Sequence, residues 1–345
     1  MKNKLITLLL IAGMAINIGC SKFNDDISNS NDIDNKKEDQ EVDKIPSYVK
    51  IKYNPSILGK RAKENLSDEA IRFYEEILIP GVLNRDLEIK IPNEITENEK
   101  ALITNYFQQN CPLEYFAGTP FLNVKGDTIL FDYTNCYYMT EEQYNKEIEK
   151  ISTSIENIIN NNIKDSYNYL ETIFVLYKYL SENTTYNLEA RSTSAYGVLV
   201  NNEGICGGFS QALQVLLNQL ELDEGYQVEW NPGDDRPGHV WNALMLDNNW
   251  YYFDATWENG ETDGKGLRYF AMDINRRDLG NLPRDEYNMC PLSLNIDIPT
   301  CYDDRFSILQ YCTEYELDLD NHRVNFKNSE DNKWYTLNTI NYNIE

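Results

Sequence analysis

The chain has 345 residues, of which 41% are hydrophobic and 12% aromatic, so it is long enough to bury a substantial core and is not disordered overall. Its formal net charge is −25. Binding to a phosphate backbone needs clustered Lys and Arg, so we exclude a nucleic-acid partner.

The first twenty residues are typical of an export signal. Lys2 and Lys4 precede an apolar stretch that is too short to span a bilayer comfortably. The stretch ends in Ile18-Gly19-Cys20-Ser21, which resembles the lipidation motif of bacterial lipoproteins, in which the cysteine is lipidated and becomes the mature N-terminus. Asn17 departs from that motif, and cleavage after Ala15 is the competing interpretation.

Residues 21–48 are rich in Asn, Asp, Ser, Lys and Glu and contain almost nothing apolar. This composition predicts a solvated acidic tether. Together with lipidation of Cys20, it predicts a cell-envelope lipoprotein that is held on the extracytoplasmic face of the membrane by its lipid.

Residues 49–165 combine helix-capping signals with strand patterns and therefore predict an N-terminal α+β region. Thr96 and Glu99 form a T-x-x-E capping box, and Thr140 with Gln143 has the same spacing. In chain order we expect a helix from Ser67 that stops near Pro80, a strand at 87–91, a helix after Thr96, a hairpin at 121–133 that turns at 125–127, and a helix after Thr140.

Residues 166–288 are expected to form the core of the protein. A helix is predicted at 167–180, and two apolar runs at 238–246 and 250–257 are typical of buried strands joined by a turn at 247–249. Residues 289–345 mix short strand-like pieces with loops, which indicates a β-rich C-terminal extension. The fold class is thus α+β.

Cys206 stands among glycines where a long helix is expected to begin. The N-terminus of a helix carries partial positive charge and unpaired N–H groups, which favours the nucleophilic thiolate over the thiol. Three flanking glycines, Gly204, Gly207 and Gly208, leave the sulfur open to approach. A buried structural cysteine is the alternative. The helix itself is indicated by one apolar stripe: Phe209, Leu213, Leu216, Leu217 and Leu220.

A thiolate nucleophile needs a base, and the chain has two histidines, His239 and His322. His322 lies in a polar run that indicates a solvated loop, whereas His239 begins an apolar strand. Asp254 is a carboxylate inside the second apolar run, so it requires a partner. His239 is the candidate, although a symmetric hairpin about Asn248 would place Asn242 opposite Asp254.

These residues lie in three motifs, GICGGFS (204–210), GHVWN (238–242) and FDATW (253–257), whose order and spacing resemble bacterial transglutaminase-like proteins. The resemblance extends over about residues 60–290 and includes CPLEYFAG (111–118) and LRYFAMD (267–273). It implies a papain-like α+β core with a catalytic triad of Cys206, His239 and Asp254, a protein or peptide substrate, and no cofactor or metal. Gly207 departs from the larger polar residue of many relatives.

Six cysteines follow Cys20, and none forms a C-x-x-C pair, which disfavours a zinc ribbon or a thioredoxin-type site. Two other functions remain open. Ser210 lies in GFSQA, close to the nucleophile elbow of serine hydrolases, which would recruit Asp254 and His322. The fold is also compatible with a surface protein that binds a glycan or a protein without catalysis.

Overall fold

The computed structural model describes residues 48–110, 120–134, 136, 139–188, 194–233, 237–278, 286–290 and 300–345. Residues 46–345 form one compact unit. The predicted signal with Cys20, the tether up to residue 47 and the CPLEYFAG segment lie outside the described residues. No helix among the described residues is both long enough and apolar enough to cross a membrane.

The N-terminal part of this unit packs short helices and a three-stranded antiparallel sheet around their own apolar cluster. Both local signals predicted here are present: Thr96 and Glu99 form a capping box, and the hairpin turns at Gly126, whose φ of +58° favours glycine. The elements are α1 (Lys60–Glu64), α2 (Asp68–Arg72), a π-helical segment (Phe73–Leu78), α3 (Ile79–Leu83), β1 (Glu88–Lys90), α4 (Glu97–Asn110), β2 (Phe121–Lys125) and β3 (Thr128–Asp132).

The predicted helix stop near Pro80 is wrong. Ser67 caps the helix as expected, but the helical path continues through the π-helical segment and Pro80 to Leu83. Pro80 stands in the first turn of α3, where a missing N–H costs little. Leu78, Ile79 and Val82 around it are therefore buried along one continuous helical run.

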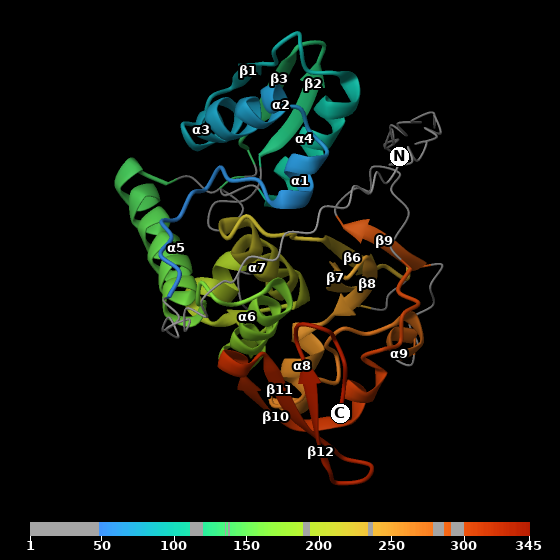
Figure 1. Ribbon diagram of the computed structural model, residues 1–345. Helices are drawn as coiled ribbons and strands as arrows, with labels where there is room; N and C mark the ends of the chain where they lie inside the picture. The colour runs from blue at the N-terminus through green and yellow to red at the C-terminus, as the bar shows by residue number, and fades with distance from the viewer. Residues whose placement is uncertain are drawn as a thin grey trace, which may run out of the picture. The chain divides into compact units, whose positions relative to one another are not determined.

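The central part is a four-stranded antiparallel sheet of order β8-β7-β6-β9 with helices packed against it (Figure 1). Helix α7 contacts both β7 and α6. Thr140 and Asn168 form capping boxes for α5 and α6. The elements are α5 (Glu141–Asn162), α6 (Tyr169–Asn183), β4 (Thr185–Tyr186), a π-helical turn (Gly197–Asn201), β5 (Glu203–Gly204), α7 (Cys206–Gln219), β6 (Tyr226–Trp230), β7 (His239–Leu246), β8 (Asn249–Phe253), α8 (Ala255–Thr262), α9 (Ile274–Asp278) and β9 (Tyr287–Cys290).

Helix α7 begins at Cys206 as predicted, but it is not amphipathic. Every residue from Gly208 to Gln219 is buried, because α6, α8 and the sheet all pack around it. Two of its polar side chains find internal partners: Gln214 accepts a hydrogen bond from Gln227, and Gln219 bonds both backbone groups of Asn54. A rigid central helix thus holds the Cys206 end in place.

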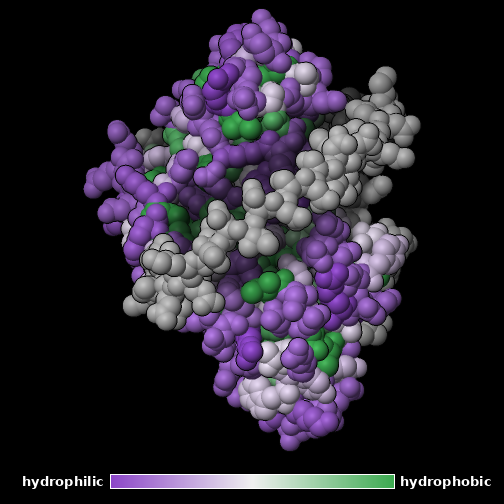
Figure 2. Space-filling view, viewed as in Figure 1, coloured by the Kyte–Doolittle hydropathy of each residue, from purple (hydrophilic) through white to green (hydrophobic). Residues whose placement is uncertain are grey.

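The C-terminal strands form a separate three-stranded antiparallel sheet of order β10-β11-β12 (Figure 1). This agrees with the β-rich character expected after residue 289. The elements are two 3₁₀ turns (Ser307–Tyr311 and Leu319–Asn321), β10 (Cys312–Asp318), β11 (Arg323–Asn328) and β12 (Trp334–Asn338). The visible face of the molecule is mainly hydrophilic, with small separate apolar areas (Figure 2).

Candidate active site

Cys206 is the first residue of α7 and is half-buried. Ile205 occupies the position before the helix and provides no side-chain cap, so the first N–H groups of α7 are not satisfied by that residue. Strand β5, which ends just before Cys206, pairs in parallel with β4. This pairing holds the backbone that leads into α7. The sulfur therefore lies beside the positive end of a buried helix.

His239 lies between the two partners expected of it. Its Nε2 lies 2.7 Å from Asp254 Oδ2, and the Cys206 side chain is close enough to help raise the pKa of the ring. Because Asp254 occupies Nε2, the nitrogen that remains for the sulfur is Nδ1. The pairing of Asp254 with His239, predicted from the sequence, is present in the structure, while the catalytic roles stay a prediction.

The register of the hairpin explains how Asp254 reaches His239. A two-residue turn at Asp247 and Asn248, both with positive φ, pairs Asn242 with Phe253. The predicted pairing of Asn242 with Asp254 is therefore wrong by one residue. With this register, Asp254 comes directly after β8 and lies on the same face of the sheet as Trp241 and His239. His239 is then a diagonal neighbour of Asp254, at a separation that long side chains can bridge.

Asp254 is not inside a strand, as the apolar run suggested. Strand β8 ends at Phe253, and Asp254 is the N-cap of α8, where its Oδ1 accepts a hydrogen bond from the Trp257 N–H at 3.0 Å. One carboxylate thus starts a helix with one oxygen and holds the imidazole with the other. An aspartate before an apolar helical turn is a capping signal that was readable in the sequence.

The histidine and the aspartate stabilise each other's charged forms. Burial alone would lower the pKa of His239, but the Asp254 carboxylate outweighs this effect, and the pKa of His239 rises to about 9. Burial likewise favours the neutral form of Asp254, yet the nearby His239 and Arg277 cations lower its pKa below the ordinary value. The imidazolium–carboxylate pair is the favoured state at neutral pH.

Arg277 and Trp257 also belong to the site, and the sequence motifs did not identify a functional role for either residue. Arg277 Nη1 donates to Asp254 Oδ2 at 3.1 Å, and Trp257 stacks on His239 with ring centroids 4.9 Å apart. The segment LRYFAMD, which is part of the family resemblance, contributes an isolated bridge of Met272 with Tyr252. No short motif marks Arg277, so only three-dimensional packing identifies it.

Two further expectations are corrected around Cys206. Gly204 is buried, and a Cβ there would lie 2.4 Å from Val198 Cγ2, so this glycine allows close packing rather than access to the sulfur. Ser210 lies inside α7 and is buried, not at a strand-to-helix elbow. His322 bonds Glu171 at 2.7 Å and not Asp254, which removes the serine-hydrolase interpretation. His322 is also not simply a solvated loop residue.

Asn242 ties the two halves of the site together. Its Nδ2 donates to the Ser210 backbone oxygen at 3.0 Å, which joins β7 to α7. This hydrogen bond therefore helps to fix the position of the strand that carries His239 relative to the helix that carries Cys206.

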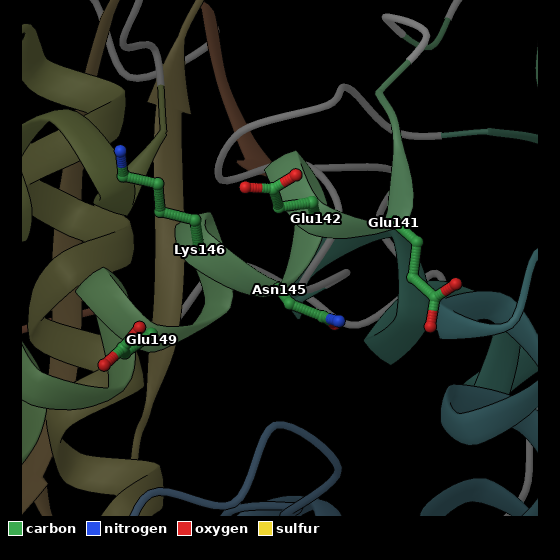
Figure 3. Close-up of a pocket in the computed structure, with 5 residues that line it drawn as sticks. All are labelled: Glu141, Glu142, Asn145, Lys146 and Glu149. Atoms are coloured by element: carbon green, nitrogen blue, oxygen red, sulfur yellow. The ribbon is translucent and has the colours of Figure 1, made fainter.

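A hollow lined by the first turns of α5 lies elsewhere (Figure 3). Its lining side chains come from one helix and fan out in different directions rather than converge on a point. None of them belongs to the triad, so we assign the hollow no function. They are Glu141, Glu142, Asn145, Lys146 and Glu149. Within the described part of the chain, no cluster of His, Cys, Asp and Glu is placed to hold a metal ion.

Comparison with known families agrees with this geometry. Residues 155–255 match the transglutaminase-like superfamily. The matched range contains Cys206, His239 and Asp254, and it runs from α5 to the start of α8. A search of curated proteins finds no significant match to the chain.

Proposed function

Because the chain carries a transglutaminase-like superfamily domain at residues 155–255, we propose that it is a thiol-dependent acyl-transfer enzyme that acts on peptide or glutamine amide bonds. The observation that carries this proposal is the hydrogen-bonded pair of His239 and the buried Asp254, with the Cys206 side chain acting on the same imidazole. A thiol, a base and an orienting carboxylate in that order constitute the arrangement that covalent acyl transfer needs.

In the proposed reaction the proton of the Cys206 thiol already resides on His239 as an imidazolium, and the thiolate attacks the carbonyl carbon of the substrate amide. The backbone N–H of Cys206 at the start of α7 stabilises the oxyanion. The imidazolium then protonates the leaving amine, and the acyl group remains on sulfur as a thioester. Water or a second amine, deprotonated by His239, attacks the thioester and regenerates the thiol.

Water is our first choice for the acyl acceptor. Hydrolysis and amine transfer share the same thioester and differ only in the nucleophile that reaches it. Water is always present in a cell envelope, so we propose peptidase or isopeptidase activity ahead of transglutaminase-type transfer.

A thiol-directed activity probe, followed by peptide and glutamine amide donors with and without a fluorescent primary amine, tests the proposal. We expect probe labelling at Cys206 and turnover that is lost in C206A. The matched control is C312A, because Cys312 is a free thiol that is buried away from the triad. Turnover that survives in C206A, or a chain that neither labels nor turns over any donor, contradicts the enzyme proposal and favours a non-catalytic binding protein.

We also propose that the mature protein is anchored to the extracytoplasmic face of the membrane through a lipid on Cys20. The Ile18-Gly19-Cys20-Ser21 motif and the polar tether after it support this proposal. Intact-mass analysis of the mature chain should find a lipidated Cys20, and C20A should release the protein from the membrane fraction. An unmodified N-terminus at Ile16 contradicts it.

A further inference from the structure

Arg277 is a buried cation directly behind the triad. It lies on α9, which Asp273 caps by accepting a hydrogen bond from the Arg276 N–H. The side chains of Arg277 and Asp254 are both 0% exposed. Asp254 Oδ2 is thus shared by two donors, His239 at 2.7 Å and Arg277 at 3.1 Å.

Two tryptophans hold the guanidinium in place. Its Cζ lies 3.8 Å from the Trp241 ring centroid and 4.0 Å from that of Trp257. The other stacking partner of Trp257 is the His239 ring itself, at 4.9 Å and 15°. A planar, permanently charged group fits between two ring faces, a geometry that lysine cannot reproduce.

The charge balance of this cluster depends on the protonation state of His239. While His239 is protonated, Asp254 has two cations beside it. When His239 has given its proton to a leaving amine, Arg277 is the charged group that still holds the buried carboxylate. A buried carboxylate that loses its counter-ion is strongly unfavourable, so it would either take up a proton or prevent His239 from releasing one.

We propose that Arg277 is a positioning residue for the triad: it is the permanent counter-ion that keeps Asp254 ionised and oriented while His239 alternates between its charged and neutral forms. This inference rests on the proposed thiol chemistry of Cys206. Arg277 does not contact the substrate in this proposal, but acts on His239 through Asp254.

The proposal predicts a direction for the titration of His239. Arg277 opposes the charged form of the imidazole and thereby lowers the pKa of His239, whereas Asp254 raises it. A neutral residue at 277 should therefore raise the pH at which His239 loses its proton. The titratable and charged groups around the pair come from five elements: Cys206 on α7, Tyr177 on α6, Tyr186 on β4, Glu258 on α8 and Arg277 on α9.

The chain contains only two histidines, so NMR titration of the imidazole C–H signals reports on His239 directly, with H322N for assignment. In the intact protein we expect a His239 midpoint near pH 9. R277M should raise this midpoint by about one pH unit or more, because the opposing charge is removed. R277K, which brings a positive charge but not the planar stacked group, should move the midpoint less than R277M does.

Arg276 provides the matched control. It is a neighbouring buried arginine whose guanidinium bonds the backbone oxygens of Ala271, Phe306 and Arg268 rather than the triad. R276M should reduce stability and leave the His239 midpoint unchanged. An unchanged midpoint in R277M, or an equal shift in R276M, overturns the proposal.

If R277M does not fold, R277Q takes its place, because its amide keeps one donor for Asp254 without a charge. If neither folds, recovery of folding in D254N/R277M supports the charge pairing, and failure to recover contradicts it.

Alkylation of Cys206 by iodoacetamide separates the proposed thiol-dependent function from the proposed role of Arg277. If Cys206 is unreactive at neutral pH in the unchanged protein, the proposed function fails, whereas a reactive Cys206 with an unmoved His239 midpoint in R277M overturns only the role of Arg277.

Discussion

The two histidines of the chain each bond a fully buried carboxylate, and the two pairs differ in what surrounds them. His239 Nε2 and His322 Nδ1 both lie 2.7 Å from a carboxylate oxygen, of Asp254 and Glu171 respectively. The His239 side chain is 11% exposed and its imidazole also interacts with the Cys206 side chain in a way that raises its pKa, whereas the His322 side chain is 37% exposed. A histidine–carboxylate contact alone therefore does not mark an active site.

The surroundings of Glu171 show what its pair does. Its Oε2 accepts the Asn168 N–H of the α6 capping box at 2.9 Å, and its Oε1 accepts the Thr339 hydroxyl as well as His322. These contacts join the start of α6 to the C-terminal sheet. The Glu171–His322 pair is an anchor between α6 and the C-terminal sheet. The Asp254–His239 pair instead lies between the Cys206 side chain and the buried Arg277 cation.

Removal of each histidine in turn should show the largest difference between the two pairs. H239A should lower turnover by at least about 10³-fold, because the thiolate loses its base and the leaving amine loses its acid. H322N, which tolerates the αL conformation of this position, should keep turnover within about twofold. Steady-state kinetics with the best donor found for the enzyme measures both.

A double variant sharpens the same test. C206A/H239A should be little worse than either single change, because members of a triad act as a unit. Losses that multiply, or an H322N that is as damaged as H239A, would contradict the assignment of different roles to the two histidines.

The second comparison concerns the two carboxylates. D254N should lower the free energy of unfolding by about 3 kcal/mol, because Arg277 keeps a buried charge without its counter-ion. E171Q should lower it by about 1 kcal/mol, because the amide oxygen still accepts the Asn168 N–H and the amide NH2 can donate to the Thr339 hydroxyl oxygen. Urea denaturation at pH 7 measures both, and a larger loss in E171Q would reverse our interpretation.

The third prediction concerns pH. The pKa of His239 in the folded chain is about 9, above the ordinary value of 6.5, so its contribution to stability is complete below pH 6.5 and is lost as the pH rises through about 9. The free energy of unfolding should therefore fall by on the order of 2 kcal/mol between pH 6.5 and pH 9.5. In H239Q this part of the fall should be absent. An identical pH profile in H239Q would show that His239 is not charged in the folded protein.

The smallest effect is expected at the anchor. H322N removes one hydrogen bond to Glu171 at a partly exposed position and should destabilise the fold by about 1 kcal/mol. Thermal unfolding measures this change, and the matched variant N321A alters a neighbouring exposed residue that bonds only Asp318. A loss of several kcal/mol in H322N would mean that the C-terminal sheet depends on this pair far more than we propose.

Local signals in the sequence predicted much of the fold. The capping boxes at Thr96 and Thr140 need only three-residue spacings, and the turn at Gly126 needs only one glycine between two alternating runs. The start of α7 at Cys206 was likewise predicted from local sequence. The motif order then predicted that Cys206, His239 and Asp254 belong to one site.

What the sequence did not predict depends on contacts between distant segments. His322 and Glu171 are 151 residues apart, and no periodicity connects them. Arg277 is one of two adjacent arginines, and only the packing of α9 determines which of them faces Asp254. The diagonal reach from His239 to Asp254 depends on a one-residue difference in turn length, which apolar alternation does not specify.

The central claim is that Cys206 is a thiolate nucleophile paired with His239, and the pH dependence of iodoacetamide alkylation tests it most directly. Cys312 is the internal reference, because burial raises the pKa of its thiol to about 12. Peptide mass spectrometry should find Cys206 labelled well below pH 8, Cys312 unlabelled at that pH, and the Cys206 rate reduced at least tenfold in H239A. Labelling of Cys206 that begins only above about pH 8.5, at the same rate with and without His239, would contradict the account.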